Sequence, residues 1–131
     1  MNKWSEVILR VALGLVFLLH GVAKFSGGIE GVEEFFISLS IPGFLAIIVA
    51  TIETVGGILM ILGLIPRIVA ALFMIVLIGA MATVTFPLGF VGGFELEFIL
   101  FVVSFSVFLN NGWKQWNAWQ PNTVHNNGGI E

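Results

Sequence analysis

The stretch TIETVGGILMILGL, residues 51–64, decides the fold of this chain. It belongs to an apolar, glycine-rich run over residues 44–65, which is long enough for a membrane-spanning helix of about 20 residues. Glu53 lies inside that run. An ionisable side chain at mid-membrane costs about 3 kcal/mol or more, so it is rarely found there without a partner or a function. The stretch therefore predicts a membrane helix and marks Glu53 as a candidate functional residue.

The rest of the sequence repeats this apolar pattern. Of its 131 residues, 58% are hydrophobic and only 10% are charged. Three further apolar runs cover residues 7–25, 68–86 and 94–109. Because short connections imply antiparallel neighbours, we expect an all-α integral membrane four-helix bundle that forms a single domain over residues 1–112. No room is left for a soluble catalytic domain.

The basic residues predict an orientation in the membrane. Lys3, Arg10, Arg67 and Lys114 fall on one side of the predicted bundle, and Lys24 falls on the other. The positive-inside rule therefore places both termini in the cytoplasm.

Two segments outside the spans have distinct predicted roles. Residues 29–42 form the longest loop, with an amphipathic piece that could lie at the interface as an outer lid. Residues 113–131 begin with tryptophans every three residues, which is typical of a membrane-interface anchor, and end in a flexible tail rich in Asn and Gly. The tryptophans are Trp113, Trp116 and Trp119.

The polar residues of the first two spans share helix faces. At 100° per residue, each set falls within an arc of roughly 120°. The sets are Arg10, Gly14, Phe17, His20, Gly21 and Lys24 on the first span, and Glu53, Gly56, Gly57, Met60, Gly63 and Arg67 on the second. Glycine faces let helix backbones approach closely in membranes, so Gly56, Gly57 and Gly63 are predicted packing residues. The arrangement predicts an outward-opening polar cavity with Glu53 at its floor.

The other two spans contribute less. The third carries no charge, and its polar residues are Thr83 and Thr85, so it is predicted to be scaffold. The fourth begins with Glu95 and Glu97 on opposite faces of its first turn. Helical spacing slightly favours Glu97 as the one that faces the interior, but both remain candidates at the rim of the cavity.

Structural interpretations compete with functional ones at these positions. Glu53 could form a structural pair with Arg10 or His20, or hydrogen-bond across helices in its protonated form. His20 could be a packed, hydrogen-bonded histidine. The long side chains of Lys24 and Arg10 could extend to opposite membrane–water interfaces.

The composition also excludes classes of chemistry. The chain has no cysteine, which excludes disulfides, thiol redox chemistry and cysteine-ligated clusters within it. Its two histidines are too few and too far apart to predict a metal or haem centre. The net charge of -3 comes with no basic patch, so we expect no binding to nucleic acid.

Four sequence elements, taken in order, resemble the DoxX family of small four-helix bacterial membrane proteins. They are LRVALGLVFLLHGVAKF, IPGF, IETVGGILMILGLIPRIVAAL and GGFELEF. The resemblance covers nearly the whole predicted bundle and is closest to the branch associated with catechol and quinone resistance. It implies a multi-pass protein of the bacterial cytoplasmic membrane that takes part in redox systems, quinone detoxification or the response to oxidative stress.

The resemblance leads to a hypothesis in which a quinone or catechol binds in the bundle. Glu53 and His20 would exchange protons with a quinol-type oxygen, and Lys24 would supply positive charge to a developing phenolate. Glu95 or Glu97 would connect the pocket to outer water, and Arg10 is assigned to the same binding set. No intrinsic cofactor is expected, so electrons would come from a soluble oxidoreductase partner or a diffusing reductant.

Two alternatives from other functional classes remain. The first is a carrier or channel for a small aromatic compound or weak acid, gated by protonation of Glu53. Four helices make a small unit for transport, so this alternative predicts a homo-oligomer. The second is an anchor that holds soluble oxidoreductases at the membrane.

Overall fold

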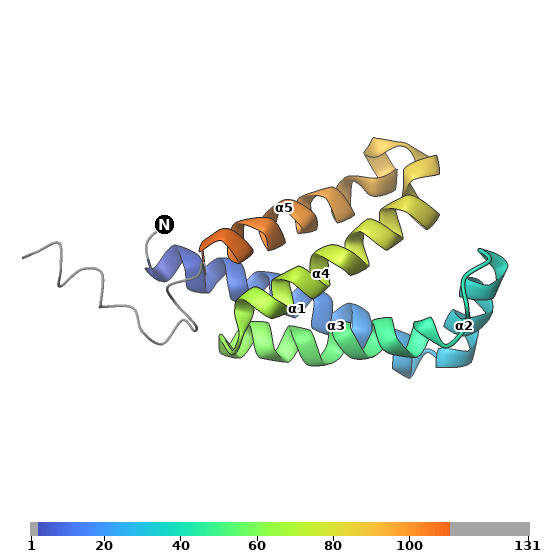
Figure 1. Ribbon diagram of the computed structural model, residues 1–131, viewed down its shortest axis with the longest axis horizontal. Helices are drawn as coiled ribbons and strands as arrows, with labels where there is room; N and C mark the ends of the chain where they lie inside the picture. Colours follow the sequence, from blue (N-terminus) through green and yellow to red (C-terminus); the bar gives the residue numbers. More distant parts are fainter. Residues whose placement is uncertain (1–2, 111–131) are drawn as a thin grey trace, which may run out of the picture.

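The computed structural model describes residues 3–110, which form four long helices and one short one (Figure 1). The long helices are α1 (Lys3–Ser26), α3 (Leu45–Leu62), α4 (Pro66–Ala80) and α5 (Glu95–Asn110), and the short one is α2 (Ile29–Ser38). No strand occurs within this part of the chain. The predicted all-α helical bundle is confirmed. The predicted segment 113–131 lies outside the described residues.

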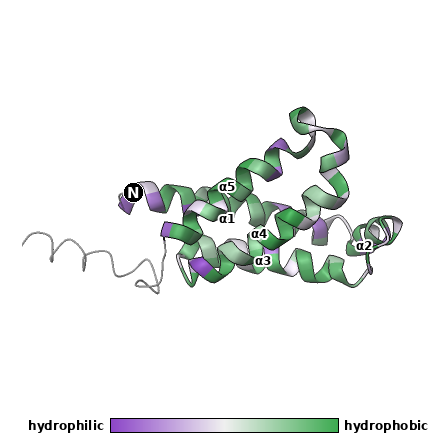
Figure 2. Cartoon of the chain, turned by 45° about the horizontal axis from the view of Figure 1, so that its top comes forward, coloured by the Kyte–Doolittle hydropathy of each residue, from purple (hydrophilic) through white to green (hydrophobic). Residues whose placement is uncertain are grey.

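Four stretches are long and apolar enough to cross a membrane, as predicted. They are Lys3–Ser26, Leu45–Leu62, Pro66–Leu88 and Phe90–Asn110. Figure 2 shows that these helices are hydrophobic along most of their length. The first described residues of α1 and the last of α5 lie at the same end of the bundle (Figure 1). Which side of the membrane that end faces remains a prediction.

The third and fourth spans are longer than the apolar runs alone predicted. After α4, the chain continues through a π-helical turn, η1 (Met81–Thr85), and a 3-10 turn, η2 (Phe86–Leu88). A second wide turn, η3 (Phe90–Phe94), leads into α5. Gly89 and Gly92 have φ values of 83° and 76°, which only glycine adopts readily. These glycines allow the chain to reverse its direction where the span Pro66–Leu88 ends and the span Phe90–Asn110 begins.

Glycines bring α1 and α3 into backbone contact. A Cβ atom on Gly57 would lie 2.7 Å from the carbonyl oxygen of Gly14, and a Cβ on Gly14 would lie 2.6 Å from that of Gly57. Gly56, on the neighbouring face of α3, instead receives the ring of Phe73 from α4. Since any larger side chain would separate these helices, the glycines fix how closely α1, α3 and α4 approach.

The packed core lies in the middle of the bundle. The rings of Phe17 and Phe73 stack with centroids 3.7 Å apart and join α1 to α4. Leu13, Met60 and Val107 complete the contacts around them. Towards the end that carries α2, α4 and the turns that follow it diverge from α1 and α3 (Figure 1). This divergence leaves space between the helices.

The segment predicted as a long loop contains a helix. Residues 29–38 form α2, which starts after Gly28 (φ 98°) and lies across one end of the bundle (Figure 1). Helical spacing within the amphipathic piece explains the difference, because apolar side chains recur on the face that turns towards the other helices. We refer to this end of the molecule as the α2 end.

Candidate functional site

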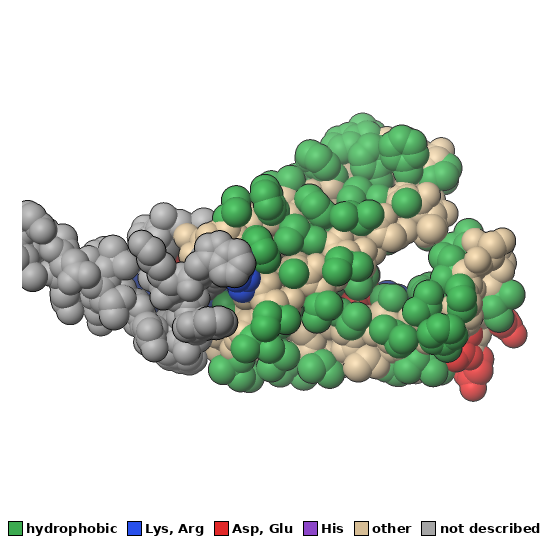
Figure 3. Space-filling view, in the orientation of Figure 1, with side chains coloured by type: hydrophobic (Ala, Val, Ile, Leu, Met, Phe, Trp, Pro, Cys, Tyr) green, Lys and Arg blue, Asp and Glu red, His purple; other side chains and the backbone are tan. Residues whose placement is uncertain are grey.

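A cavity of about 760 Å³ occupies the space at the α2 end. Its walls come from the end of α1, from α2, from the first half of α3, and from α4 with η1. Figure 3 shows the hollow between the α2 side and the α4 side of the molecule. Most of the lining is apolar, and its ionisable side chains are Lys24, Glu53 and Glu97. The site is therefore an apolar chamber with a few polar groups, which is the usual composition of a small-molecule pocket.

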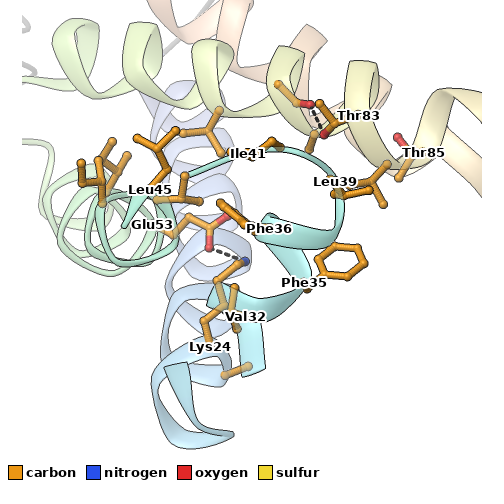
Figure 4. A pocket seen from close by; sticks show the side chains of 18 of the residues that line it. Lys24, Val32, Phe35, Phe36, Leu39, Ile41, Leu45, Glu53, Thr83 and Thr85 are labelled. Carbon is orange, nitrogen blue, oxygen red and sulfur yellow. Dashed lines mark hydrogen bonds and ion pairs between the residues drawn. The ribbon is translucent and has the colours of Figure 1, made fainter. Parts of the chain in front are cut away.

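Lys24 and Glu53 form an ion pair in the wall of this cavity. The Lys24 Nζ atom donates a hydrogen bond of 2.7 Å to Glu53 Oε1 (Figure 4). The Glu53 side chain is 8% exposed and that of Lys24 is 24% exposed. The partner of Glu53 is thus Lys24, and the structural pairs predicted with Arg10 and His20 are wrong.

The close approach of α1 to α3 places this pair. A Cβ atom on Gly21 would clash with the backbone of Thr54, which directly follows Glu53. Side chains of a helix lean back towards its N-terminus, so Lys24, three residues after Gly21, extends to the level of that contact. Its long side chain therefore reaches Glu53 across the α1–α3 interface.

A second polar group reaches the cavity from α5 and η1. Glu97 and Thr85 both line it, and Glu97 Oε1 and Thr85 Oγ1 are buried without a hydrogen-bond partner among residues 3–110. Nearby, Thr83 Oγ1 donates to the carbonyl oxygen of Gly79 within its own helix. The third span was predicted to be scaffold only. Its last turns in fact form one wall of the cavity, and the two threonines were the signal for this in the sequence.

Glu95 has a different environment from Glu97. Its side chain is exposed and accepts a 2.7 Å hydrogen bond from the backbone N–H of Gly92, so it stabilises the turn before α5. Glu95 does not line the cavity, whereas Glu97 does. Of the two glutamates that the sequence left open, Glu97 is the one that points inward.

Arg10 is buried, but it lies away from the cavity. Its Nη1 atom donates a 3.2 Å hydrogen bond to the carbonyl oxygen of Met60, in the last turn of α3. A Cβ atom on Gly63 would lie only 2.5 Å from Nη1, and Gly63 has a φ of 78°. Arg10 thus places positive charge at the negative end of the α3 dipole. This position gives it a structural contact, and the binding role predicted for it finds no support in this geometry.

His20 also lies outside the cavity. Its side chain is exposed, and Nδ1 is 2.8 Å from the carbonyl oxygen of Val16, one turn earlier in α1. On the helical wheel His20 is at the edge of the predicted polar arc, about 80° from Arg10. That angle carries it past the α1–α3 interface and onto the outer surface, so the pocket position predicted for His20 is wrong.

The described residues offer no cluster of metal ligands. Within residues 3–110, no group of three or more histidine, aspartate or glutamate side chains could hold a metal ion. The ionisable groups that do converge on the cavity are one ammonium, one paired carboxylate and the carboxyl group of Glu97, whose Oε1 atom has no hydrogen-bond partner among residues 3–110. Such a site can hold an apolar molecule that carries oxygen or hydroxyl groups.

Comparisons with known proteins give a consistent result. The family model described as DoxX matches residues 6–86. The chain is 43% identical over 107 residues to a Bacillus subtilis (strain 168) protein named "Putative oxidoreductase CatD", and the alignment covers 79% of each chain. No solved structure matches the chain.

Proposed function

This chain belongs to the DoxX family, and on that basis we propose that it is a membrane subunit of a redox system that binds a quinone- or catechol-type molecule in the cavity. The name of the Bacillus subtilis relative supports the redox part of this proposal. We further propose that the protein lies in the bacterial cytoplasmic membrane with both termini in the cytoplasm, so that the α2 end faces outward.

The Lys24–Glu53 pair in an apolar cavity is the observation on which the proposal depends. A quinone has two carbonyl oxygens that accept hydrogen bonds, and its reduced form has two hydroxyl groups that donate them. The Lys24 ammonium can donate to the carbonyl oxygen and stabilise the negative charge of a phenolate. The Glu53 carboxylate can accept a hydrogen bond from the quinol hydroxyl group and can take up the proton of that group. An apolar ring fits the rest of the lining.

The redox balance of the proposal requires a source of electrons outside this chain, either a partner protein or a diffusing reductant. Reduction of a quinone to its quinol adds two electrons and two protons to the ring oxygens. Glu53 and Lys24 can pass a proton to and from one of these oxygens, and the proton of the other oxygen would be exchanged with Glu97 or with water in the cavity. The side chains of this chain supply no electrons, since it has no cysteine. We propose that a soluble oxidoreductase that carries its own redox cofactor docks on the bundle and exchanges the electrons. In this scheme the membrane subunit supplies the binding site.

Ligand titration of the purified protein tests the proposal. We expect a short-chain quinone and its quinol to bind saturably to the wild type in mild detergent, as measured by calorimetry. Glu53→Gln should weaken quinol binding about tenfold or more, since a hydrogen bond to a charged acceptor contributes about 1.5–3 kcal/mol. His20→Ala is the matched control, because His20 is exposed and outside the cavity, and it should bind like the wild type.

The same titration separates this proposal from a role as a membrane anchor. If well-folded protein binds neither form of the ligand, the proposed function is wrong, and the Lys24–Glu53 pair then has a structural role in joining α1 to α3. Equal binding by the wild type and Glu53→Gln would instead remove Glu53 from the site while leaving ligand binding in place.

A further inference from the structure

Two exposed side chains of the membrane-spanning helices line the cavity, and we call the part of the cavity between them its mouth. Ile48 of α3 and Ile75 of α4 both line the cavity, and they are 45% and 67% exposed. An exposed apolar side chain within a membrane span faces lipid or an open cavity, because lipid tails are as apolar as such a side chain. Ile75 is well inside the span Pro66–Leu88, far from either end. The cavity is thus lined by exposed side chains at a level within the membrane-spanning part of the bundle.

The shape of the cavity agrees with a side opening. Figure 3 shows a hole between the α2 side and the α4 side that is viewed across the long helices and not along them. Since the helices span the membrane, a hole in this direction opens in the plane of the bilayer. Its polar groups include the Lys24–Glu53 pair, in which the Glu53 side chain is only 8% exposed (Figure 4). Ile48 and Ile75, by contrast, are apolar and exposed.

We infer that the ligand enters sideways from the bilayer, between α3 and α4, and that it is an amphipathic molecule with an apolar tail. The polar head would contact Lys24 and Glu53, and the tail would pass between Ile48 and Ile75 into the lipid. This inference rests on the proposed function and makes it more specific, because it selects a lipid-dissolved quinone with a side chain over a small water-soluble catechol. The tail needs no closed chamber, since lipid covers its outer end.

Single cysteines in reconstituted protein test the route, because the chain has no cysteine of its own. Ile48→Cys and Ile75→Cys each place one thiol at the mouth. Ile68→Cys is the matched control, since Ile68 is an exposed residue of α4 at 56% that does not line the cavity. Each variant is placed in phospholipid vesicles and labelled with a lipophilic maleimide.

Two ligands are then tested for their ability to protect the thiols from the maleimide. Both have a fully substituted benzoquinone ring, which has no free position for a thiol to attack. One ring carries a decyl group and the other carries a methyl group in its place.

The result expected is protection of the mouth thiols by the tailed quinone alone. At about ten times its Kd in the membrane, the free fraction of the site falls to roughly one-eleventh, so labelling of the Ile48→Cys and Ile75→Cys variants should slow about tenfold. The ring with a methyl group should leave both mouth thiols reactive, and neither ligand should change labelling of the Ile68→Cys variant.

Other outcomes would overturn the inference. If the two ligands bind the wild type equally and neither protects the mouth thiols, the lateral route is wrong while the proposed function remains. Failure of both mouth thiols to label, when the Ile68→Cys variant labels normally, would show that no opening to lipid exists. If neither quinone binds the wild type at all, the proposed function itself fails and the inference fails with it.

Discussion

Lys24 and Glu53 are 29 positions apart in the sequence, yet Lys24 Nζ and Glu53 Oε1 lie 2.7 Å apart and join the end of α1 to the middle of α3. Glu53 is nearly buried and Lys24 is partly exposed, so the two partners differ in how well they tolerate loss of the other. This asymmetry leads to a prediction about stability that is independent of any ligand.

Loss of Lys24 should destabilise the fold more than loss of the Glu53 charge. Lys24→Met leaves a buried carboxylate without its cation, which costs about 3 kcal/mol when such a pair is broken. Glu53→Gln leaves Lys24 free to extend towards the interface, so its cost should be about 1 kcal/mol. The double variant Lys24→Met/Glu53→Gln should be more stable than Lys24→Met alone. Unfolding midpoints of all four proteins in one detergent complete the double-mutant cycle.

A second prediction concerns the glycine contact between α1 and α3. Gly57→Ala places a methyl group against the Gly14 carbonyl oxygen, which would lie 2.7 Å away. Because neither backbone can give way easily, we expect a loss of about 1–3 kcal/mol. Gly79→Ala is the control, since nothing lies within 4 Å of its Cβ position and alanine favours the helix. A wild-type unfolding midpoint for Gly57→Ala would show that the two helices are not held by this contact.

The sequence predicts helix faces well and helix partners poorly, and Glu53 illustrates both. Helical periodicity and the cost of a charge in the membrane placed Glu53 on the glycine face of an interior helix, where it lies. Periodicity gives the angle of a residue on its own helix, but it does not give the register of one helix against another. Arg10 and Lys24 share a face and are separated by roughly 21 Å along the helix axis, at about 1.5 Å per residue. Only the glycine contacts in the structure decide that Lys24 is level with Glu53.

The cavity walls illustrate a second limit of the sequence. Hydropathy cannot distinguish an apolar side chain that lines a cavity from one that faces lipid, because both environments favour the same residues. The contributions of Phe35 and Ile75 to the wall therefore could not be read from composition or spacing. They depend on the divergence of α4 from α3 and on the π-helical turn that ends the third span.

A third prediction assigns Arg10 a structural role. Arg10→Lys keeps the charge near the C-terminus of α3, but it loses the guanidinium hydrogen bond to the Met60 carbonyl oxygen. We expect a loss of stability of about 1–2 kcal/mol with no change in quinone or quinol affinity. Calorimetry and thermal unfolding on the same sample separate the two effects. Weaker ligand binding by a fully folded Arg10→Lys variant would restore Arg10 to the site.

The last prediction concerns Glu97, whose Oε1 atom is buried without a partner in the described part of the chain. A buried polar atom without a hydrogen bond is costly, so Glu97→Gln, which removes the charge, should leave the fold as stable as the wild type or make it more so. The same change should weaken quinol binding, because Glu97 lines the cavity and its carboxylate can accept a hydrogen bond from a ligand hydroxyl group. We expect a loss of about tenfold, which corresponds to about 1.4 kcal/mol.

Glu95→Gln provides the control for Glu97. Glu95 is two positions away and also precedes the apolar part of α5, but it is exposed and bonds only to the Gly92 N–H among the contacts that the structure gives it. The amide oxygen of glutamine can accept the same hydrogen bond, so both stability and binding should stay close to wild type. Functional groups often sit where the fold alone would favour another residue, so higher stability together with weaker binding is the signature of a binding residue. If Glu97→Gln instead lowers stability and leaves binding intact, Glu97 belongs to the packing of α5 and the binding chemistry of the cavity rests on Lys24 and Glu53 alone.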